Sequence, residues 1–182
     1  EHAALKLIPT ADVIAMLFMS ATLGDKACGI TGKRMGYAFD RGTDGGLAIA
    51  SEILSNAFPA VEWGLALTAG KRTDTGATNG TGVDFLVGST TFGLVAYLEV
   101  FAFTGTSVTV AIQESSDNGG TDPFAAVTGG AFVAASALGA QRIQTILTQT
   151  VERYLRAVTT GTFTSAQFAV MAKRYATASA EL

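Results

Sequence analysis

Residues 94–114 read LVAYLEVFAFTGTSVTVAIQE, and the apolar pattern of this stretch decides the fold class. Val108, Val110 and Ile112 alternate with more polar residues, which is the period-two pattern of a strand with one buried face. Residues 94–103 are apolar at both alternating positions, which is typical of a central strand covered on both sides. Because the two runs flank the segment Thr-Gly-Thr-Ser at 104–107, we expect a β-hairpin that turns there.

A similar pattern returns at residues 153–173, RYLRAVTTGTFTSAQFAVMAK. A Tyr-Leu pair, a charged residue and a Thr-Gly-Thr segment recur there in the same order as in 94–114. The repeat is short and degenerate, so it indicates a second, similar hairpin rather than a solenoid. Two such hairpins can supply the facing sheets of a sandwich. We therefore expect residues 83–175 to form an antiparallel β-sandwich.

The first part of the chain is predicted as a separate β-rich assembly domain over residues 1–68. It begins with a short helix at 1–8 that Pro9 ends. Its expected strands cover residues 11–19, 28–39, 47–54 and 61–67, with a Gly-rich turn at 40–46. Residues 48–54 would also suit a helix. Residues 69–82 contain no large apolar side chain, so a linker is expected between the two domains. Residues 176–182 are expected to be a frayed polar tail. The fold class is mainly β.

The charge content excludes one class of partner. Charged residues make up 15% of the chain and the formal net charge is −3, which argues against an electrostatic nucleic-acid binder. Such low charge fits a surface covered by partner molecules, and it fits an uncharged surface rich in Thr and Ser equally well. The apolar run at 13–19 is too short to cross a bilayer and no signal-peptide pattern is present, so no membrane partner is expected.

The residues that usually carry chemistry form no recognisable constellation. Cys28 is the only cysteine, which excludes a Cys-based zinc site. His2 is the only histidine, and a His-containing triad is not expected. The aspartates at 40, 44, 117 and 122 fall in Gly-rich turns, where they usually cap the backbone. The loop 117–122 could instead hold a loose Ca²⁺, although it lacks the ligand spacing of an EF-hand. We expect no enzyme activity, no catalytic residue, no cofactor and no metal site.

Aromatic residues in 83–175 allow two interpretations. At strand spacing they are most often core residues. If exposed and coplanar, they would form a sugar-stacking platform, as in a carbohydrate-binding module. The residues concerned are Tyr97, Phe101, Phe103, Phe163, Phe168 and Tyr175.

One long segment resembles a known family. Residues 62–84, EWGLALTAGKRTDTGATNGTGVD, together with 101–110, 141–143 and 153–164, are similar to stretches of structural proteins from tailed bacteriophages. These are tail tube (major tail) proteins, whose β-rich tube domain is followed by an Ig-like or jelly-roll-like outer domain. The resemblance is strongest between Trp63 and Arg174.

The resemblance implies a mechanical role with no catalytic residues to transfer. Identical subunits would form stacked rings, as a homo-oligomer, around a conduit through which DNA passes without specific binding. Other tail or head proteins would be the further partners. The protein would be made in the cytoplasm of a bacterial host and end in the virion. A capsid or tail decoration protein is the alternative within this class, and a carbohydrate-binding β-sandwich is the alternative outside it.

Overall fold

The computed structural model describes residues 11–43, 45–55 and 61–177, and every regular element in these ranges is a strand. The mainly-β class expected from the sequence is therefore confirmed. The predicted helix at 1–8 and the end of the predicted tail lie outside the described residues. The strands are β1 (Val13–Phe18), β2 (Lys26–Arg41), β3 (Leu47–Ser55), β4 (Glu62–Ala66), β5 (Arg72–Asp74), β6 (Thr78–Asn79), β7 (Val83–Asp84), β8 (Leu94–Ser115), β9 (Ala125–Ala131), β10 (Gly139–Gln144) and β11 (Tyr154–Arg174).

The strands form one antiparallel sheet with the order β1-β2-β4-β11-β8-β10. Three short strands, β5, β6 and β7, add to β11, while β3 adds to β2 and β9 adds to β8. The second half of the chain and the first half thus belong to the same sheet. The apolar patterns at 124–127 and 131–134 predict two short strands, where the structure has the single strand β9. The alternation at 141–149 predicts a strand there, and the structure has the shorter β10.

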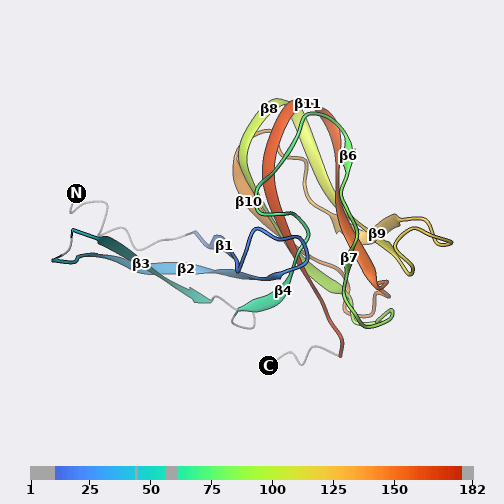
Figure 1. Cartoon of the computed structure of the whole chain (residues 1–182), viewed down its shortest axis with the longest axis horizontal. Coiled ribbons are helices and arrows are strands. Elements are labelled where there is room, and N and C mark those ends of the chain that lie inside the picture. Colours follow the sequence, from blue (N-terminus) through green and yellow to red (C-terminus); the bar gives the residue numbers. More distant parts are fainter. Residues whose placement is uncertain (1–10, 44, 56–60, 178–182) are drawn as a thin grey trace.

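The prediction of two separate hairpins is wrong, because the two stretches pair with each other. The register runs from Tyr154 opposite Ser115 to Arg174 opposite Leu94, along the whole of both strands. Neither strand turns back at its Thr-Gly segment. Both bend there instead, and the register shifts around Phe163 mark bulges at the bend. Figure 1 shows β8 and β11 arching over together at the top of the molecule.

The bend makes the two halves of the β8–β11 ribbon enclose the principal core. Val110 and Ile112 from one half of β8 join the same buried cluster as Leu98 from the other half. Leu155 and Phe168 of β11 belong to it as well, and all five side chains are at most 1% exposed. The alternation at 108–112 expected from the sequence is confirmed, since the residues between these positions are only half-buried.

A second core lies on the other face of the first half of β8. Val95 and Tyr97 pack there with Met171 of β11 and with Ala27 and Ala66 of β2 and β4. Ile14, Met16 and Phe18 of β1 cover this cluster. The first part of β8 is thus covered on both faces, which confirms the expectation from its continuous apolar run.

Two short strands lie where a linker was expected at residues 69–82. β5 pairs with β11 at Phe168, and β6 pairs with it at Val158. Asp74 is buried. The segment is part of the sheet rather than a linker. It has no large apolar side chains to pack, and backbone hydrogen bonds and a buried ion pair hold it in place instead.

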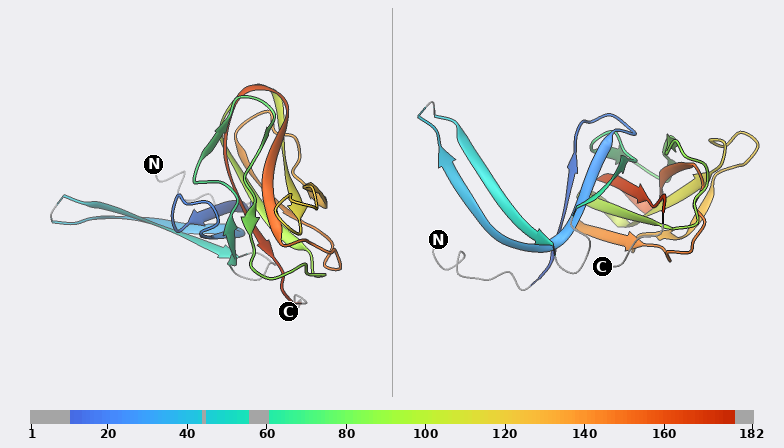
Figure 2. Two further views of the ribbon diagram at one scale, coloured as in Figure 1. Left: turned by 45° about the vertical axis from the view of Figure 1, so that its right-hand side comes forward. Right: turned by 90° about the horizontal axis from the view of Figure 1, so that it is seen from below.

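The β2–β3 hairpin extends away from this packed body. β2 is one continuous strand whose first residues pair with β4 and whose remainder pairs with β3, up to Arg41 opposite Leu47. The turn predicted at 40–46 is shorter than expected, because β2 continues to Arg41, and the strand predicted at 47–54 is confirmed as β3. Figures 1 and 2 show the hairpin as a long curved ribbon with no other strand beside its far end.

Candidate assembly interface

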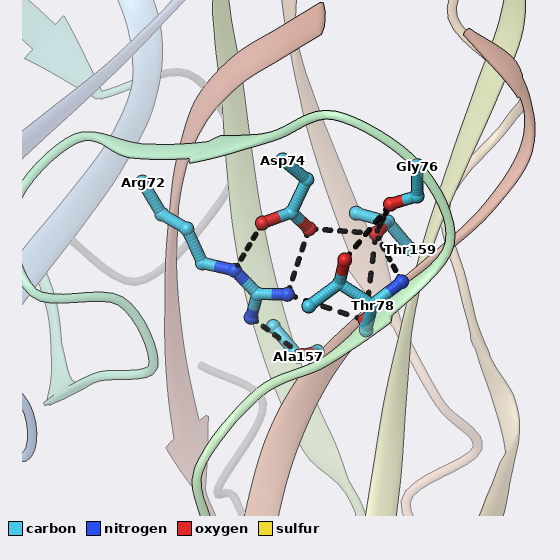
Figure 3. Close-up of polar contacts among 6 residues, drawn as sticks. All are labelled: Arg72, Asp74, Gly76, Thr78, Ala157 and Thr159. Atoms are coloured by element: carbon cyan, nitrogen blue, oxygen red, sulfur yellow. Dashed lines mark hydrogen bonds and ion pairs between the residues drawn. The ribbon is translucent and has the colours of Figure 1, made fainter. Parts of the chain in front are cut away.

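A buried ion pair fastens the β5–β6 segment to β11 (Figure 3). The Nε and Nη2 atoms of Arg72 donate to the two carboxylate oxygens of Asp74 at 2.8 and 2.7 Å. Nη1 of Arg72 donates to the carbonyl of Ala157 at 3.0 Å, and the hydroxyl of Thr159 donates to Asp74 at 2.6 Å. Gly80 leaves the room for this contact, since a Cβ there would lie 2.5 Å from Arg72 Nη1.

The geometry of this cluster is that of a structural clasp. The bidentate Arg–carboxylate pair is the strongest form of side-chain ion pair, and here it is mostly removed from water. Both carboxylate oxygens and all three guanidinium nitrogens have partners within the chain. We infer that the cluster orders the β5–β6 segment against β11.

A second buried cluster surrounds Glu62 at the start of β4. Glu62 is 1% exposed and accepts from Arg142 Nε at 2.8 Å and Nη2 at 3.0 Å. The hydroxyls of Tyr97 and Tyr175 also donate to its carboxylate. These contacts connect Tyr175, the residue that follows β11, to β4, β8 and β10. A Cβ on Gly29 would lie 2.6 Å from the Tyr97 ring, so glycine is what allows this tyrosine to reach Glu62.

The pKa values in this cluster follow from burial and hydrogen bonding. Burial alone would raise the pKa of Glu62, but the hydrogen bonds from Arg142 and the two tyrosines lower it overall. Burial beside the Glu62 carboxylate raises the pKa of Tyr97, and it raises the pKa of Tyr175 to about 12. The carboxylate therefore stays ionised and the phenols stay neutral, which is the arrangement of a structural network rather than of an acid–base pair.

The aspartates at 117–122 bind the backbone of their own loop. Asp117 accepts from the N–H groups of Gly120 and Thr121 at 2.9 and 2.5 Å, and Asp122 accepts from Ser116 at 2.8 Å. These contacts use the oxygens that a loose Ca²⁺ would need. Among the described residues, no three His, Cys, Asp or Glu side chains gather as a metal site would require.

The aromatic residues considered for sugar stacking lie mostly in the core. Tyr97, Phe168, Tyr175 and Phe163 are between 0% and 8% exposed. Phe101 and Phe103 are half-buried, and the ammonium of Lys71 lies 4.5 Å from the centre of the Phe101 ring. The interpretation as a sugar-binding platform therefore loses the residues on which it rested.

The hairpin carries large apolar side chains in solvent. Met35, Leu47 and Leu54 are 56%, 61% and 59% exposed. In its register Asp40 lies opposite Ala48 and Gly36 lies opposite Glu52. Its two strands also contain Ala38 and Ala50 at paired, exposed positions. One face of the hairpin is thus lined by small residues between two acidic ones.

A second exposed apolar surface lies on the body, around Trp63. The register places Leu17, Cys28 and Trp63 side by side on β1, β2 and β4. Leu17 and Trp63 are 55% and 52% exposed, although β4, which carries Trp63, has a paired strand on each side. The sequence predicted a strand at Trp63 but gave no sign that the tryptophan faces solvent, because β4 is short and does not alternate.

Beside Trp63 the surface is hollowed into a groove of about 550 Å³, called the Trp63 groove from here on. Its apolar lining includes Met19, Leu65, Phe85 and Leu86, and its basic residues include Lys26 and Lys173. Met19 and Leu86 are 54% and 78% exposed. Monomeric proteins seldom expose so many large apolar side chains together, so such a surface marks a site of interaction.

No protein-family model, curated protein or solved structure matches this chain. In the part of the chain that the structure describes, no helix has the length and apolar content needed to cross a membrane.

Proposed function

We propose that this chain is a self-assembling structural subunit of a virion, and that it serves as a tail tube subunit of a tailed bacteriophage. The β2–β3 hairpin is the observation that carries the proposal. The hairpin extends from the body and exposes more than half of the Met35, Leu47 and Leu54 side chains. An isolated two-stranded ribbon is marginally stable in water. A two-stranded hairpin as long and exposed as β2–β3 is therefore best explained by a partner that covers it.

The edges of the sheet add to this argument. An exposed edge strand presents backbone donors and acceptors that can pair with another chain, and natural monomers usually protect such edges with charges or bulges. The stretch Leu47–Ser55 contains one charged residue, Glu52. β3 therefore has little that opposes strand pairing, so neighbouring copies of the chain are the natural partners of this hairpin.

The charge of the chain suits a conduit for DNA. The formal net charge is −3, and no run of Lys or Arg exceeds two residues. A wall without a basic patch releases few counterions from DNA and therefore does not retain it. DNA would pass such a wall without specific binding.

Electron microscopy and sedimentation velocity of the purified chain test the proposal. We expect rings or tubes for the wild type. In a variant whose residues 35–52 are replaced by Asn-Gly, a two-residue turn joins the paired positions Arg34 and Ile53. This variant should keep the β-type circular dichroism of the body and sediment as a monomer. A wild type that stays monomeric, or a hairpin-deleted chain that still assembles, would refute the proposal. Closed rings that never stack would favour the decoration protein.

A further inference from the structure

We propose that the β2–β3 hairpin is a hinged arm, which swings as one ribbon about residues 30–32 of β2. This inference goes beyond the proposed function, because the pivot follows from how the hairpin is joined to the body and exists whether or not subunits assemble. Only its use in assembly, which is to change the angle at which the arm meets a neighbouring subunit, rests on the proposed function.

β2 changes its partners at the base of the hairpin. Gly32 is the last β2 residue that pairs with β1, opposite Val13, and the first that pairs with β3, opposite Ser55. The pairing of β2 with β4 ends at Gly29. From residue 33 onward, β3 is the one strand that pairs with β2 among the described strands. The body therefore holds β2 up to residue 32, and the hairpin extends from there as a two-stranded ribbon.

The register of the strands beside β2 changes across residues 30 and 31. Two residues separate Gly29 from Gly32 on β2, whereas six separate Ser55 from Glu62 on the facing side (62 − 55 − 1). The β2–β3 and β2–β4 registers therefore differ by four residues (6 − 2), and they cannot form one continuous ladder. A shift of this kind bends a strand and increases its twist. Figure 2 shows β2 bent between the body and the hairpin.

Glycines stand at both ends of the pivot, at positions 29 and 32. Hinges often use small residues, because a glycine absorbs changes of φ and ψ with little steric cost. The β3 backbone approaches Gly32 closely, and a Cβ there would lie 2.1 Å from the carbonyl oxygen of Leu54. The hydroxyl of Thr31 is buried without a hydrogen-bond partner among the described residues. The side chain of Thr31 thus does not fix the angle of the pivot.

Beyond the pivot, little packing holds the arm at one angle. Among the described residues, neither buried core cluster contains a residue between 33 and 55. An ion pair crosses the pivot, with Lys33 Nζ 2.9 Å from Asp12 Oδ1, and each of these side chains is 36% exposed. Ion pairs this exposed contribute little stability, so the pair can open when the arm moves. Segments with few buried contacts move at a lower cost in free energy than core strands do.

Distances between pairs of spin labels, measured by pulsed electron paramagnetic resonance, test the swing. The labels are attached to cysteine variants in a Cys28→Ala background, and the monomer fraction from size-exclusion chromatography is measured. The arm–body pair is Ala48→Cys with Thr121→Cys, the arm pair is Met35→Cys with Arg41→Cys, and the body pair is Thr104→Cys with Thr121→Cys. All five positions are exposed.

The arm–body pair should give a broad distribution of distances, and the arm and body pairs should each give a narrow one. Residue 48 lies opposite Asp40, eight residues beyond Gly32, which corresponds to about 26 Å along the strand. A swing of about 30° therefore moves this label by about 13 Å. An arm–body distribution as narrow as that of the body pair would overturn the inference. So would an arm pair as broad as the arm–body pair, because the hairpin would then be unfolded rather than hinged.

Two glycine variants locate the pivot. Gly32→Ala places a methyl group against the Leu54 carbonyl and should shift the mean arm–body distance while the arm pair keeps its narrow distribution. Gly36→Ala is the matched control on the same strand, since a Cβ there meets no atom within 4 Å, and it should leave the arm–body distribution unchanged. Equal effects of the two variants would contradict a pivot at residues 30–32.

The same measurement separates this inference from the proposed function. A chain that never assembles but shows the broad arm–body distribution refutes the proposed function and supports the hinge. A chain that forms rings or tubes but whose monomer has a narrow arm–body distribution refutes the hinge alone.

Discussion

Gly105 of β8 lies directly against Phe163 of β11, at the point where both strands bend. A Cβ at Gly105 would be 2.4 Å from the Phe163 Cα, and the φ of Gly105 is +151°. Phe163 is 8% exposed and closes one end of the principal core. The bend that turns one long ribbon into two facing layers therefore depends on the absence of a side chain at this position.

Gly105→Ala should lower the free energy of unfolding by about 2 kcal/mol or more, because the new methyl group meets backbone atoms and the φ is strained for alanine. Gly139→Ala is the matched control, since a Cβ at Gly139 has no atom within 4 Å. Chemical denaturation of both variants measures the difference. Equal effects would show that the bend does not require glycine at 105.

Val110→Asp should destabilise the protein by several kcal/mol, because Val110 is 1% exposed and an unpaired carboxylate is costly to bury. Thr109→Asp places the same charge on the half-buried opposite face of the strand and should cost much less. Thermal unfolding of the two variants gives the comparison. Similar losses in melting temperature would contradict the register of β8.

The Glu62 cluster should make stability depend on pH at both ends of the scale. Because the folded pKa of Glu62 is lowered, its contribution is present above the unfolded value of about 4.3 and is lost as pH falls through the folded value. Glu62→Gln leaves Arg142 buried without its charge partner and should cost about 3–5 kcal/mol at pH 7. The cost should shrink as the pH falls below about 4.3, because the wild type then progressively loses the stability that its ionised carboxylate provides. The exposed Glu52→Gln is the control, and an unchanged cost at pH 3 would contradict the prediction.

At alkaline pH the same cluster acts through its phenols. The pKa of Tyr175 is raised from 10.0 to about 12, so the neutral phenol stabilises the fold below pH 10 and this contribution disappears between pH 10 and 12. Tyr175→Phe cannot ionise and should show a shallower loss of stability over this range. Denaturation midpoints at several alkaline pH values measure the two slopes. Identical slopes would show that Tyr175 ionises as freely in the folded state as in the unfolded chain.

Fragments divided at residue 82 test whether the predicted domains fold separately. Residues 83–175 alone would lose Leu67 from the principal core and the strands β4, β5 and β6 from the edge of β11. We expect this fragment to aggregate or to unfold without a cooperative transition. A fragment that melts as one cooperative β-sheet unit would support the boundary expected from the sequence.

The sequence by itself determined the fold class and most of the strands. The alternation at 108–112 indicated a strand with one buried face, because the pleat of a strand repeats every two residues. The continuous apolar run at 94–98 indicated a strand buried on both faces. The turn at 40–46 was also readable, since its Gly and Asp residues suit few other conformations. These features depend only on neighbours along the chain.

Only the tertiary structure decided which strands pair and what remains exposed. A Thr-Gly-Thr segment suits a hairpin turn and a bend equally well, and the choice at Gly105 depends on Phe163, 58 residues away (163 − 105). The segment 69–82 lacks apolar residues, yet the long-range contacts of Arg72 and Asp74 with β11 bring it into the sheet. Trp63 likewise lies in solvent because β4 turns Glu62 toward the core. Such outcomes follow from contacts between distant residues, which local pattern does not encode.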